Sequence, residues 1–571
     1  MPILLRNLLD MKIFSAGLRA AMIAGLAGET FDLLVIGGGI TGAGIALDAA
    51  SRGLKTALIE MQDFAAGTSS RSTKLIHGGL RYLKQMEVGL VMETGREREV
   101  LHRNAPHLVV PEKMLLPLVK DGTYGPLATS FGLWVYDVLA GVKDGEQRVM
   151  LTKDQAIAQE PLIRQDILEG AGLYIEYRTD DARLTIETIK TAVAHGAVCL
   201  SYAKAVEFEY NERGKISATQ VHDQISGQTF AIKARKTVNA AGPWVDKVRE
   251  KDSTAPNSNK HLHLTKGVHI VVPFERFPAR QALYFDVPDG RMLFAIPRQG
   301  ITYLGTTDTT YQGDIQQPQT TEMDVSYLLR SANWMFPSLH LGPKDVISSW
   351  AGLRPLIHEQ GKSPSELSRK DEIFISEGGL ISIAGGKLTG YRKMAARVVD
   401  KVVRKLHKRY GTPEKESFTQ QIPLCGGDFA GGGSEAVKAL LASLAVVAQP
   451  LGLSTQYLEF LGFNFGSNAP LILNKILELR PAEPNTDSAA LKAEIWYCFH
   501  YEHVQNLADF FIRRTGRLYF QRDRLAPMLR PAAEELANLL AGGPALADQM
   551  LAEFDREYQA VLNFAQVPAL A

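Results

Sequence analysis

Cysteine is scarce in this chain of 571 residues. Only Cys199, Cys425 and Cys498 occur, far apart and with no CxxC pair. Iron–sulfur clusters and cysteine-based zinc sites need closely spaced thiolates, so the sequence excludes both. The low count also fits a reducing compartment, in which disulfides are rare. His500 and His503 stand three residues apart without an evident third ligand, and we expect no metal site.

The chain also lacks an excess of one charge and a long apolar run. It contains 63 Lys and Arg residues and 62 Asp and Glu residues, which gives a formal net charge of +1. This balance gives no support for nucleic acid as a partner, because nucleic acid binds basic surfaces. No apolar run approaches the roughly 20 residues that span a bilayer. The composition, 45% hydrophobic and 22% charged, is that of a soluble globular protein, and the length predicts about two to four domains.

What the chain does contain is a strand–turn–helix–strand unit over residues 31–60, FDLLVIGGGITGAGIALDAASRGLKTALIE. We expect Gly37 to make the tight turn, Gly39 to let backbone N–H groups approach a pyrophosphate, and Gly42 to let the helix pack on the sheet. Glu60 ends the second strand, where an acidic side chain accepts hydrogen bonds from an adenosine ribose. Its charge would repel a 2′-phosphate, which argues against NADP. The unit therefore predicts an adenine dinucleotide, NAD or FAD.

The first thirty residues have an unusual composition. Basic residues stand among apolar ones, and residues 20–28 resemble a short signal h-region. We favour a poorly ordered leader, or an upstream start codon before Met11, over an amphipathic segment that lies on a surface and over a signal peptide. We therefore expect residues 1–30 to be a leader of unclear order.

Dinucleotide-type patterns recur along the chain, at residues 31–80, 173–245 and 372–409, with mixed strand and helix between them. This interleaving predicts an α/β fold with a discontinuous Rossmann domain, an antiparallel β-sheet substrate cap and a helical C-terminal domain. We expect the cofactor domain at 31–110, 173–250 and 345–412, the cap at 111–172 and 251–344, and the helical domain at 413–571.

Two later glycine turns favour one of these two cofactors. Asn239–Gly242 and Gly385–Thr389 each follow a predicted strand and would complete the cofactor site from far along the chain. An NAD domain built from consecutive βαβ units would not need them, so FAD is favoured.

A set of motifs resembles one known family. In chain order they are SSRSTKLIHGGLRYL (69–83), DDARL (180–184), NAAGPWVD (239–246), TKGVHIVVP (265–273), LGTTD (304–308), AGLRPL (351–356) and GGKLTGYRKMA (385–395). Together they resemble the FAD-dependent glycerol-3-phosphate dehydrogenase family, of the aerobic, quinone-linked type, over residues 31–520. The resemblance implies a glutathione-reductase-like FAD-binding domain and oxidation of sn-glycerol 3-phosphate to dihydroxyacetone phosphate, with electrons passed to membrane quinone.

The substrate that this resemblance implies is a small dianion, which calls for several fixed cations. Arg354 lies between Gly and Pro in AGLRP, a setting that suits presentation of a side chain into a cleft. By resemblance, the substrate and phosphate contacts are Arg81, Tyr82, Arg354, Arg369 and Lys387. The resemblance also implies cofactor contacts beyond Gly37, Gly39, Gly42 and Glu60, namely Thr68, Ser69, His77, Gly78, Ala241, Gly242, Gly386, Lys387, Leu388 and Thr389.

Oxidation of an alcohol requires a base for the hydroxyl proton. We predict His77 and Lys266 as the catalytic candidates beside Arg354, because an arginine with a pKa above about 12 is a poor base. His269 and His358 are less favoured. Lys387 and Thr389 begin a helix whose N-terminus would stabilise negative charge on a reduced flavin. The basic face of that helix is interpreted as solvated rather than membrane-contacting.

The expected partners are glycerol 3-phosphate, a quinone acceptor and the inner face of the cytoplasmic membrane, with a possible homodimer and no nucleic acid. The protein would then be cytoplasmic and peripherally associated with the inner membrane. Three alternatives stay open: an oxygen-using glycerol-3-phosphate oxidase that makes hydrogen peroxide, an amine or amino-acid oxidase on the same fold, and a flavoprotein without turnover. The last would be expected to lose the arginine and lysine set, which the chain retains.

Overall fold

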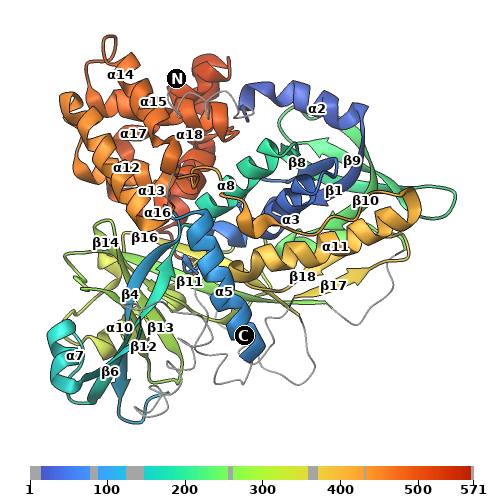
Figure 1. The fold of residues 1–571 in the computed structure, drawn as a ribbon. Helices are drawn as coiled ribbons and strands as arrows, with labels where there is room; N and C mark the ends of the chain where they lie inside the picture. The colour runs from blue at the N-terminus through green and yellow to red at the C-terminus, as the bar shows by residue number, and fades with distance from the viewer. Residues whose placement is uncertain are drawn as a thin grey trace.

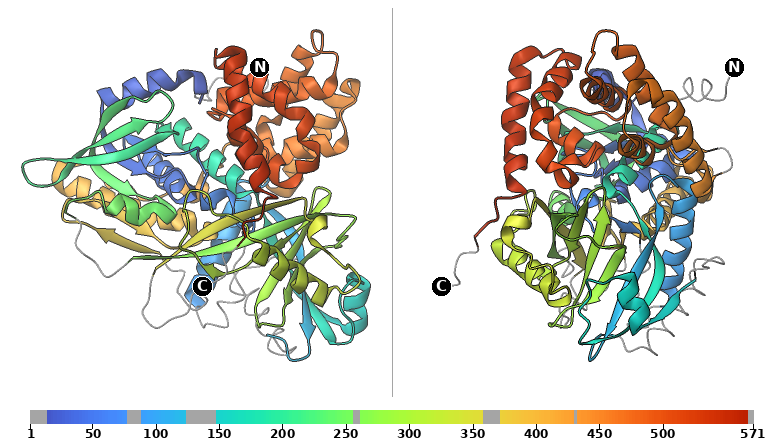
Figure 2. Two further views of the ribbon diagram at one scale, coloured as in Figure 1. Left: turned by 180° about the vertical axis from the view of Figure 1, so that it is seen from behind. Right: turned by 90° about the vertical axis from the view of Figure 1, so that its left-hand side faces the viewer.

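A computed structural model describes residues 14–76, 88–123, 147–254, 261–357, 371–429 and 432–566. The chain forms two large β-sheets and a helical C-terminal domain. Figure 1 shows the helical domain above one sheet and beside the other, and Figure 2 shows the same arrangement from two further sides. This α/β architecture is the predicted one.

The first sheet has eight strands and is mainly parallel. Its path is β17-β18-β10-β1-β2-β7, and β9 pairs with β10 and β8. The bounds are β1 Thr30–Ile36, β2 Thr56–Ile59, β7 Val198–Leu200, β8 Ala203–Tyr210, β9 Ile216–Asp223, β10 Thr229–Asn239, β17 Glu372–Ile375 and β18 Ile381–Ala384.

Strand β1 is apolar on both faces because both faces are covered. Leu33 and Val35 pack with the helices α3 (Ile40–Ser51), α8 (Asp181–Ala194) and α11 (Tyr391–Tyr410). Leu34 and Ile36 pack in the opposite direction with β8, β9 and the N-terminal helix α2 (Arg19–Gly28). Segments that lie hundreds of residues apart therefore meet around one central strand.

The second sheet has ten strands. Its path is β15-β11-β14-β13-β12-β4-β6-β3, with β16 paired to β11 and β5 paired to β6. The bounds are β3 Leu75–Ile76, β4 Val110–Val119, β5 Val149–Thr152, β6 Leu168–Arg178, β11 Leu262–Pro273, β12 Ala282–Asp286, β13 Met292–Arg298, β14 Ile301–Gly305, β15 Thr309–Thr310 and β16 Ser348–Ile357. Helix α10 (Glu322–Met335) packs on the sheet near β11 and β14, α7 (Lys153–Gln159) lies beside β5 and β6, and α5 (Val88–Asn104) precedes β4.

Two strands belong to a different sheet from the one that the expected domain limits imply. Strands β6 and β16 belong to the second sheet, although residues 173–178 and 348–357 were expected in the cofactor domain. Each strand pairs along its length with a neighbour in the second sheet. The amino-acid composition of such a strand does not show which of the two sheets it joins.

The C-terminal domain is helical, as predicted. Its elements are α12 Gly433–Ala448, α13 Thr455–Phe465, α14 Ala469–Leu479, α15 Thr486–Tyr501, the π-helical turn η9 Asp509–Arg514, α16 Arg517–Phe520, α17 Ala526–Leu539 and α18 Gly543–Ala560. They share one apolar core, which includes Phe465, Ile476, Phe511 and Leu536.

One helix contradicts the expectation that no apolar stretch is long enough to span a bilayer. Residues Gly433–Leu451 form a helix of 19 residues with a mean hydropathy of 1.3, of which only 22% is buried. By length and composition it could cross a membrane. Glu435 and Lys438 interrupt the apolar run near its start, which is why the sequence pattern alone did not show it.

The N-terminal segment is also more ordered than predicted. Residues Ala16–Leu18 form a 3-10 turn, and Arg19–Gly28 form α2, which packs on β7 and β10. Phe14 is buried against Phe64 and stacks on His503 at a ring distance of 5.1 Å. The guanidinium of Arg19 donates to the Ser201 carbonyl at 2.8 Å. The expectation of a poorly ordered leader is therefore wrong for residues 14–28, whose anchoring partners lie far along the chain.

Candidate functional site

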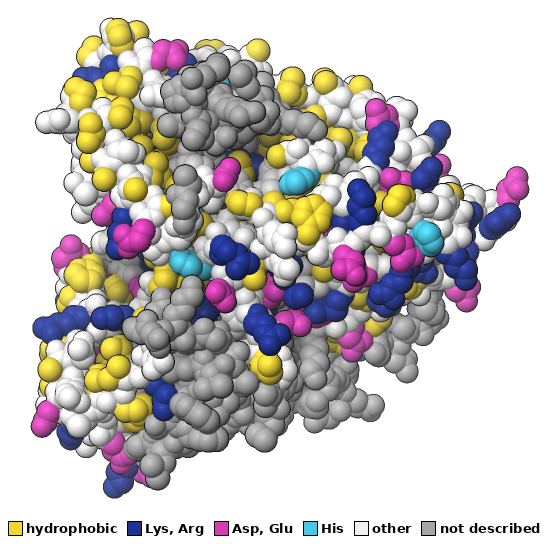
Figure 3. Space-filling model, in the orientation of Figure 1, with side chains coloured by type: hydrophobic (Ala, Val, Ile, Leu, Met, Phe, Trp, Pro, Cys, Tyr) yellow, Lys and Arg dark blue, Asp and Glu magenta, His cyan; other side chains and the backbone are white. Residues whose placement is uncertain are grey.

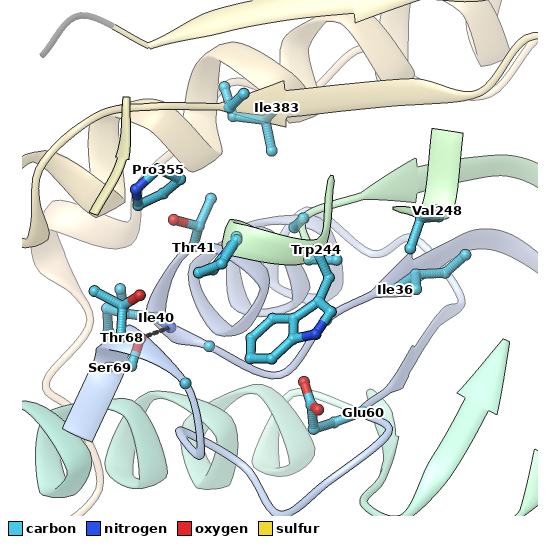
Figure 4. A pocket seen from close by; sticks show the side chains of 18 of the residues that line it. Ile36, Ile40, Thr41, Glu60, Thr68, Ser69, Trp244, Val248, Pro355 and Ile383 are labelled. Atoms are coloured by element: carbon cyan, nitrogen blue, oxygen red, sulfur yellow. Dashed lines mark hydrogen bonds between the residues drawn. The ribbon is translucent and has the colours of Figure 1, made fainter. Parts of the chain in front are cut away.

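A cavity of about 610 Å³ lies at the carboxyl ends of β1, β10 and β18. Figure 4 shows Glu60 and Ser69 on one side of it, Pro355 and Ile383 on the other, and the Trp244 ring between them. The structure brings most of the predicted cofactor residues to its wall: Gly37, Gly39, Glu60, Thr68, Ser69, Ala241, Gly242, Gly386, Lys387 and Leu388. Thr389 is buried immediately behind them.

The glycine turn after β1 has no space for side chains. Gly37 has a φ of 114°, which favours glycine. A Cβ on Gly42 would stand 1.9 Å from the Gly37 carbonyl oxygen, so Gly42 is required for the close packing of α3 on the turn. Gly39 caps α3 without a side-chain hydrogen bond, and the Ile40 N–H donates to Ser69 Oγ at 2.9 Å. A helix N-terminus that opens onto a cavity in this way is suited to an anionic phosphate group.

Glu60 stands at the end of β2 with its carboxylate at the cavity wall. It accepts hydrogen bonds from the Gly38 N–H at 2.7 Å and the Gln62 N–H at 2.8 Å. Burial raises the pKa of this carboxyl above its ordinary value, against the lowering effect of the two N–H donors. The carboxylate is thus fixed in orientation at the place where the sequence predicted ribose recognition.

Two turns from late in the chain complete the cavity. The Asn239 side chain donates to the Val245 carbonyl at 2.9 Å and accepts from the Ala241 N–H at 3.2 Å, which shapes the turn after β10. Gly385 and Gly386 have φ values of 77° and 86°, so the chain turns sharply after β18. Lys387 then caps the short 3-10 turn Leu388–Gly390 that leads into α11.

On the second sheet, the paired strands β11 and β16 present two different faces. Thr265 is opposite Arg354, Gly267 opposite Gly352, and His269 opposite Trp350. Because side chains alternate along a strand, these residues share the face that is directed toward the cofactor domain. Gly352 lies against the Arg71 carbonyl on that face, since a Cβ at Gly352 would stand 2.5 Å from it.

Arg354 is held on this face by groups of the loop after β14. Its guanidinium donates to Thr306 Oγ1 at 3.0 Å, to the Thr307 carbonyl at 3.2 Å and to Asp308 at 3.2 Å. It extends over Gly267, where a Cβ would come within 2.4 Å of a guanidinium nitrogen. The side chain is 22% exposed and stands next to Pro355, a residue of the cavity wall.

His269 lies beside Arg354 on the same face. Its ring stacks on Trp350 at 4.9 Å, and its Nε2 lies 3.0 Å from Thr73 Oγ1. Burial lowers the pKa of this imidazole well below its usual value, and the neighbouring Arg354 lowers it further. The ring is therefore neutral at physiological pH, and its Nδ1 has no hydrogen-bond partner among the residues that the structure describes.

The structure places Lys266 away from the cavity, so it gives no geometric support for the predicted catalytic role. Lys266 is on the opposite face of β11, where its ammonium group donates to Asp324 of α10 at 2.6 Å and to the Gln319 carbonyl at 3.2 Å. The side chain is buried beside α10, away from the cavity. Strand alternation explains this placement, because the residues on either side of Lys266 face the site while Lys266 does not.

The loop after Gly67 joins the cavity to the β11–β16 face. Thr68 Oγ1 donates to the Leu353 carbonyl at 2.6 Å, and the Trp350 ring N–H donates to the Ser72 carbonyl at 3.1 Å. Thr68, Ser69 and Ser72 also line the cavity. The loop therefore contacts both the cofactor wall and the β11–β16 face that carries Arg354.

Six of the predicted residues lie outside the described ranges: His77, Gly78, Arg81, Tyr82, His358 and Arg369. Their roles stay predictions. Trp244 is a residue of the cavity wall that the predicted site did not include. Trp244 stands close to Gly67, where a Cβ would come within 3.0 Å of the indole. Its position two residues after the Gly242 turn was the signal that could have identified it.

Comparisons with known proteins agree with this geometry. Residues 32–392 match the family model for FAD dependent oxidoreductases, and residues 417–542 match the C-terminal domain of alpha-glycerophosphate oxidase. The chain is 50% identical to the aerobic glycerol-3-phosphate dehydrogenase of Bacillus subtilis (strain 168) over 89% of this chain and 91% of that protein. It is 46% identical to the aerobic glycerol-3-phosphate dehydrogenase of Staphylococcus aureus (strain USA300), over 95% and 97% of the two chains.

The solved structures give the same result. The glycerol-3-phosphate dehydrogenase from Bacillus halodurans, complexed with FAD, has a TM-score of 0.82 and 43% identity over 97% of this chain and 100% of that chain. The L-alpha-glycerophosphate oxidase from Mycoplasma pneumoniae, with a TM-score of 0.53 and 17% identity over 66% of this chain and 95% of that one, shares the fold.

Proposed function

The chain belongs to the FAD-dependent glycerol-3-phosphate dehydrogenase family, of the aerobic type, and from this premise we propose how its residues carry out the reaction. The protein uses FAD to oxidise glycerol 3-phosphate. One structural observation supports the roles that we propose for these residues. The loop from Gly67 to Lys74 joins a dinucleotide-shaped cavity to a face that presents a fixed arginine and a neutral histidine.

The residues of the cavity fit FAD. The Gly37–Gly42 turn and the N-terminus of α3 would hold the pyrophosphate, and Glu60 would accept hydrogen bonds from the ribose. Lys387 and the start of α11 would place positive potential at the far end. When bound, FAD supplies a hydride acceptor for the oxidation of the substrate C2–H bond.

We assign phosphate binding to Arg354. A guanidinium presents forked N–H donors that match phosphate oxygens, and Thr306 and Asp308 hold this one in place. Arg81, Arg369 and Lys387 are the further cations that the family resemblance implies. A phosphate bound here would direct the glycerol carbons toward the cavity, because Pro355 at its wall follows Arg354 directly.

We assign the proton transfer to His269 rather than Lys266. The imidazole lies beside Arg354, and its buried Nδ1 has no hydrogen-bond partner among the described residues, so it would be the nitrogen that accepts the hydroxyl proton of a substrate held by Arg354. Thr73 fixes the ring through Nε2. His77, the base favoured by the sequence, stays a candidate.

We propose a membrane quinone as the electron acceptor, with membrane contact on the exposed face of α12. Val446 is 73% exposed and Val447 is 43% exposed, and Leu477 of the neighbouring α14 is 38% exposed. Residues 439–453 of this region carry no charge. Figure 3 shows hydrophobic side chains gathered over the helical domain. A protein bound in this way would be peripheral to the inner membrane; the possible homodimer stays a prediction.

The acceptor is tested by reoxidation of the flavin. Enzyme reduced anaerobically with glycerol 3-phosphate is mixed with a short-chain quinone or with oxygen, and the flavin absorbance is followed. We expect the quinone to reoxidise the flavin at least about tenfold faster. Equal rates with stoichiometric peroxide would instead identify an oxidase, the main alternative.

Membrane contact is tested by flotation with liposomes that contain anionic lipid. Val446→Glu places a charge on the α12 face and should reduce the bound fraction severalfold, since each buried methylene group contributes about 0.8 kcal/mol to apolar binding. Met323→Glu is the matched control, because Met323 is 67% exposed but lies on α10. Equal flotation of both variants and the unmodified protein would place any membrane contact elsewhere.

A further inference from the structure

Arg513 and Arg514, in the turn η9 of the C-terminal domain, both bind one carboxylate of the FAD-binding domain. Asp63 Oδ2 accepts from Arg513 Nε at 2.5 Å and from Arg514 at 2.5 Å, and Oδ1 accepts from Arg514 at 3.0 Å. The side chains of Asp63 and Arg514 are completely buried, and that of Arg513 is 9% exposed. This buried junction between two domains lies outside the catalytic roles assigned above.

Asp63 stands in the loop that connects two parts of the cofactor wall. Met61 and Ala66 on either side of it line the cavity. Phe64 packs directly against Gly38 of the glycine turn, where a Cβ would come within 2.7 Å of its ring. The Ala65 N–H donates to the Gly38 carbonyl at 3.0 Å. The position of Asp63 therefore sets the position of the turn that carries the phosphate-binding N–H groups.

The arginines are themselves fixed within their own domain. Arg514 donates to the Glu502 carbonyl at 2.8 Å, and Arg513 donates to Asp509 at 2.7 Å. Asp509 also accepts from the Tyr202 hydroxyl at 2.6 Å. These contacts hold both guanidiniums rigidly where Asp63 meets them.

We propose that Arg513 and Arg514 are positioning residues for FAD, which act through Asp63 and Phe64 on the Gly37–Gly42 turn. The inference rests on the FAD-binding role of the cavity. Without its cations, the Asp63 carboxylate would be buried and unpaired, and the loop would move to hydrate it. The movement would withdraw Phe64 from Gly38 and loosen the phosphate turn. Through Arg513 and Arg514, which do not line the cavity, the C-terminal domain thus contributes to the affinity for FAD.

The matched control is another buried arginine pair of the same domain. Arg517 donates to Glu494 at 2.6 and 2.9 Å, and both side chains are buried. This pair joins α15 and α16, and among the described residues no hydrogen bond or ion pair links it to the loop around Asp63. Arg517→Gln should therefore cost stability as Arg514→Gln does, without the effect on FAD.

The test measures the FAD dissociation constant of the deflavinated protein by quenching of flavin fluorescence, together with the melting temperature. We expect Arg514→Gln and Asp63→Asn each to raise the Kd about tenfold, a coupling typical of residues in one buried network, and the double variant to add little more. Arg517→Gln should stay within about twofold of the unmodified Kd. Arg513→Lys, a milder change, should give an intermediate Kd and covers the case in which Arg514→Gln does not fold.

Two results would overturn the proposal. One is an unchanged Kd in every Asp63, Arg513 and Arg514 variant that folds. The other is an equal rise in Arg517→Gln at an equal loss of melting temperature, which would show a general effect of destabilisation. If the unmodified chain does not bind FAD, the cofactor assignment fails together with this inference. The Kd of the unmodified chain, measured before that of any variant, separates this outcome from failure of the inference alone.

Discussion

In the proposed site, substrate recognition depends most directly on Arg354. Arg354→Ala removes a guanidinium whose charged hydrogen bonds to a bound phosphate would each be worth about 1.5–3 kcal/mol, so kcat/KM for glycerol 3-phosphate should fall about tenfold to hundredfold. The flavin content of the purified protein should stay unchanged. Arg354→Lys should recover only part of the activity, because an ammonium lacks the forked donors.

Arg276→Ala serves as the control for this change. Arg276 is in the same domain and pairs with Asp345 at 2.8 Å, but its side chain is 45% exposed. Its removal should leave kcat/KM within about twofold, as is usual for exposed pairs. Equal losses of FAD and of turnover in Arg354→Ala would contradict the substrate role of Arg354.

At this scale, sequence reasoning succeeded where the chemistry is local. Gly37, Gly39 and Gly42 could be predicted because six consecutive residues determine the turn and its close contacts. Lys266 could not be assigned in the same way. A strand has two faces, and the sequence pattern of β11 does not say which one meets the cofactor domain.

On strand β11, we predict that Lys266 stabilises the fold and has no part in catalysis. The Lys266–Asp324 pair joins β11 to α10 with both side chains nearly buried, so Lys266→Met should lower the melting temperature markedly. Removing one partner of a buried pair typically costs about 3–5 kcal/mol. The KM for glycerol 3-phosphate and the turnover per bound flavin should be retained, and the double variant Lys266→Met with Asp324→Leu should recover much of the stability. Loss of turnover in the folded single variant would restore Lys266 as a catalytic candidate.

Whole elements were predictable to the extent that their partners are close in sequence. The β1–α3–β2 unit follows from residues 31–60, since each segment packs on the next. Helix α2 was assigned to an unclear leader because its partners are residues such as Ser201 and Asp223, with which Arg19 bonds. The exposure of α12 also depends on tertiary packing and was missed.

At the scale of the whole molecule, His503 marks the junction of three parts. It stacks on Phe14 of the N-terminal segment, contacts Phe64 in the loop after β2, and belongs to the C-terminal domain. Burial lowers its pKa to about 3, with help from the charges of Arg19 and Arg514. In the unfolded chain a histidine titrates near 6.5, so the unfolded state takes up this proton first as the pH falls.

The sign of the pH dependence follows from that difference. The neutral form of His503 contributes stability above about pH 6.5, and the contribution is lost between about pH 6.5 and 3 at up to about 1.4 kcal/mol per pH unit. Thermal unfolding at pH 7 and 5 should show the loss. His503→Asn, which suits the φ of 55° at this position, should reduce the slope by about one proton. An unchanged slope would contradict the neutral state of His503.

The family assignment is tested most directly by the reductive half-reaction. Purified protein is mixed anaerobically, in separate samples, with glycerol 3-phosphate, glycerol and sarcosine, and the bleaching of the flavin absorbance is recorded. Because Arg354 is assigned to the phosphate, glycerol 3-phosphate alone should bleach the flavin rapidly. Bleaching by sarcosine but not by glycerol 3-phosphate would contradict the account.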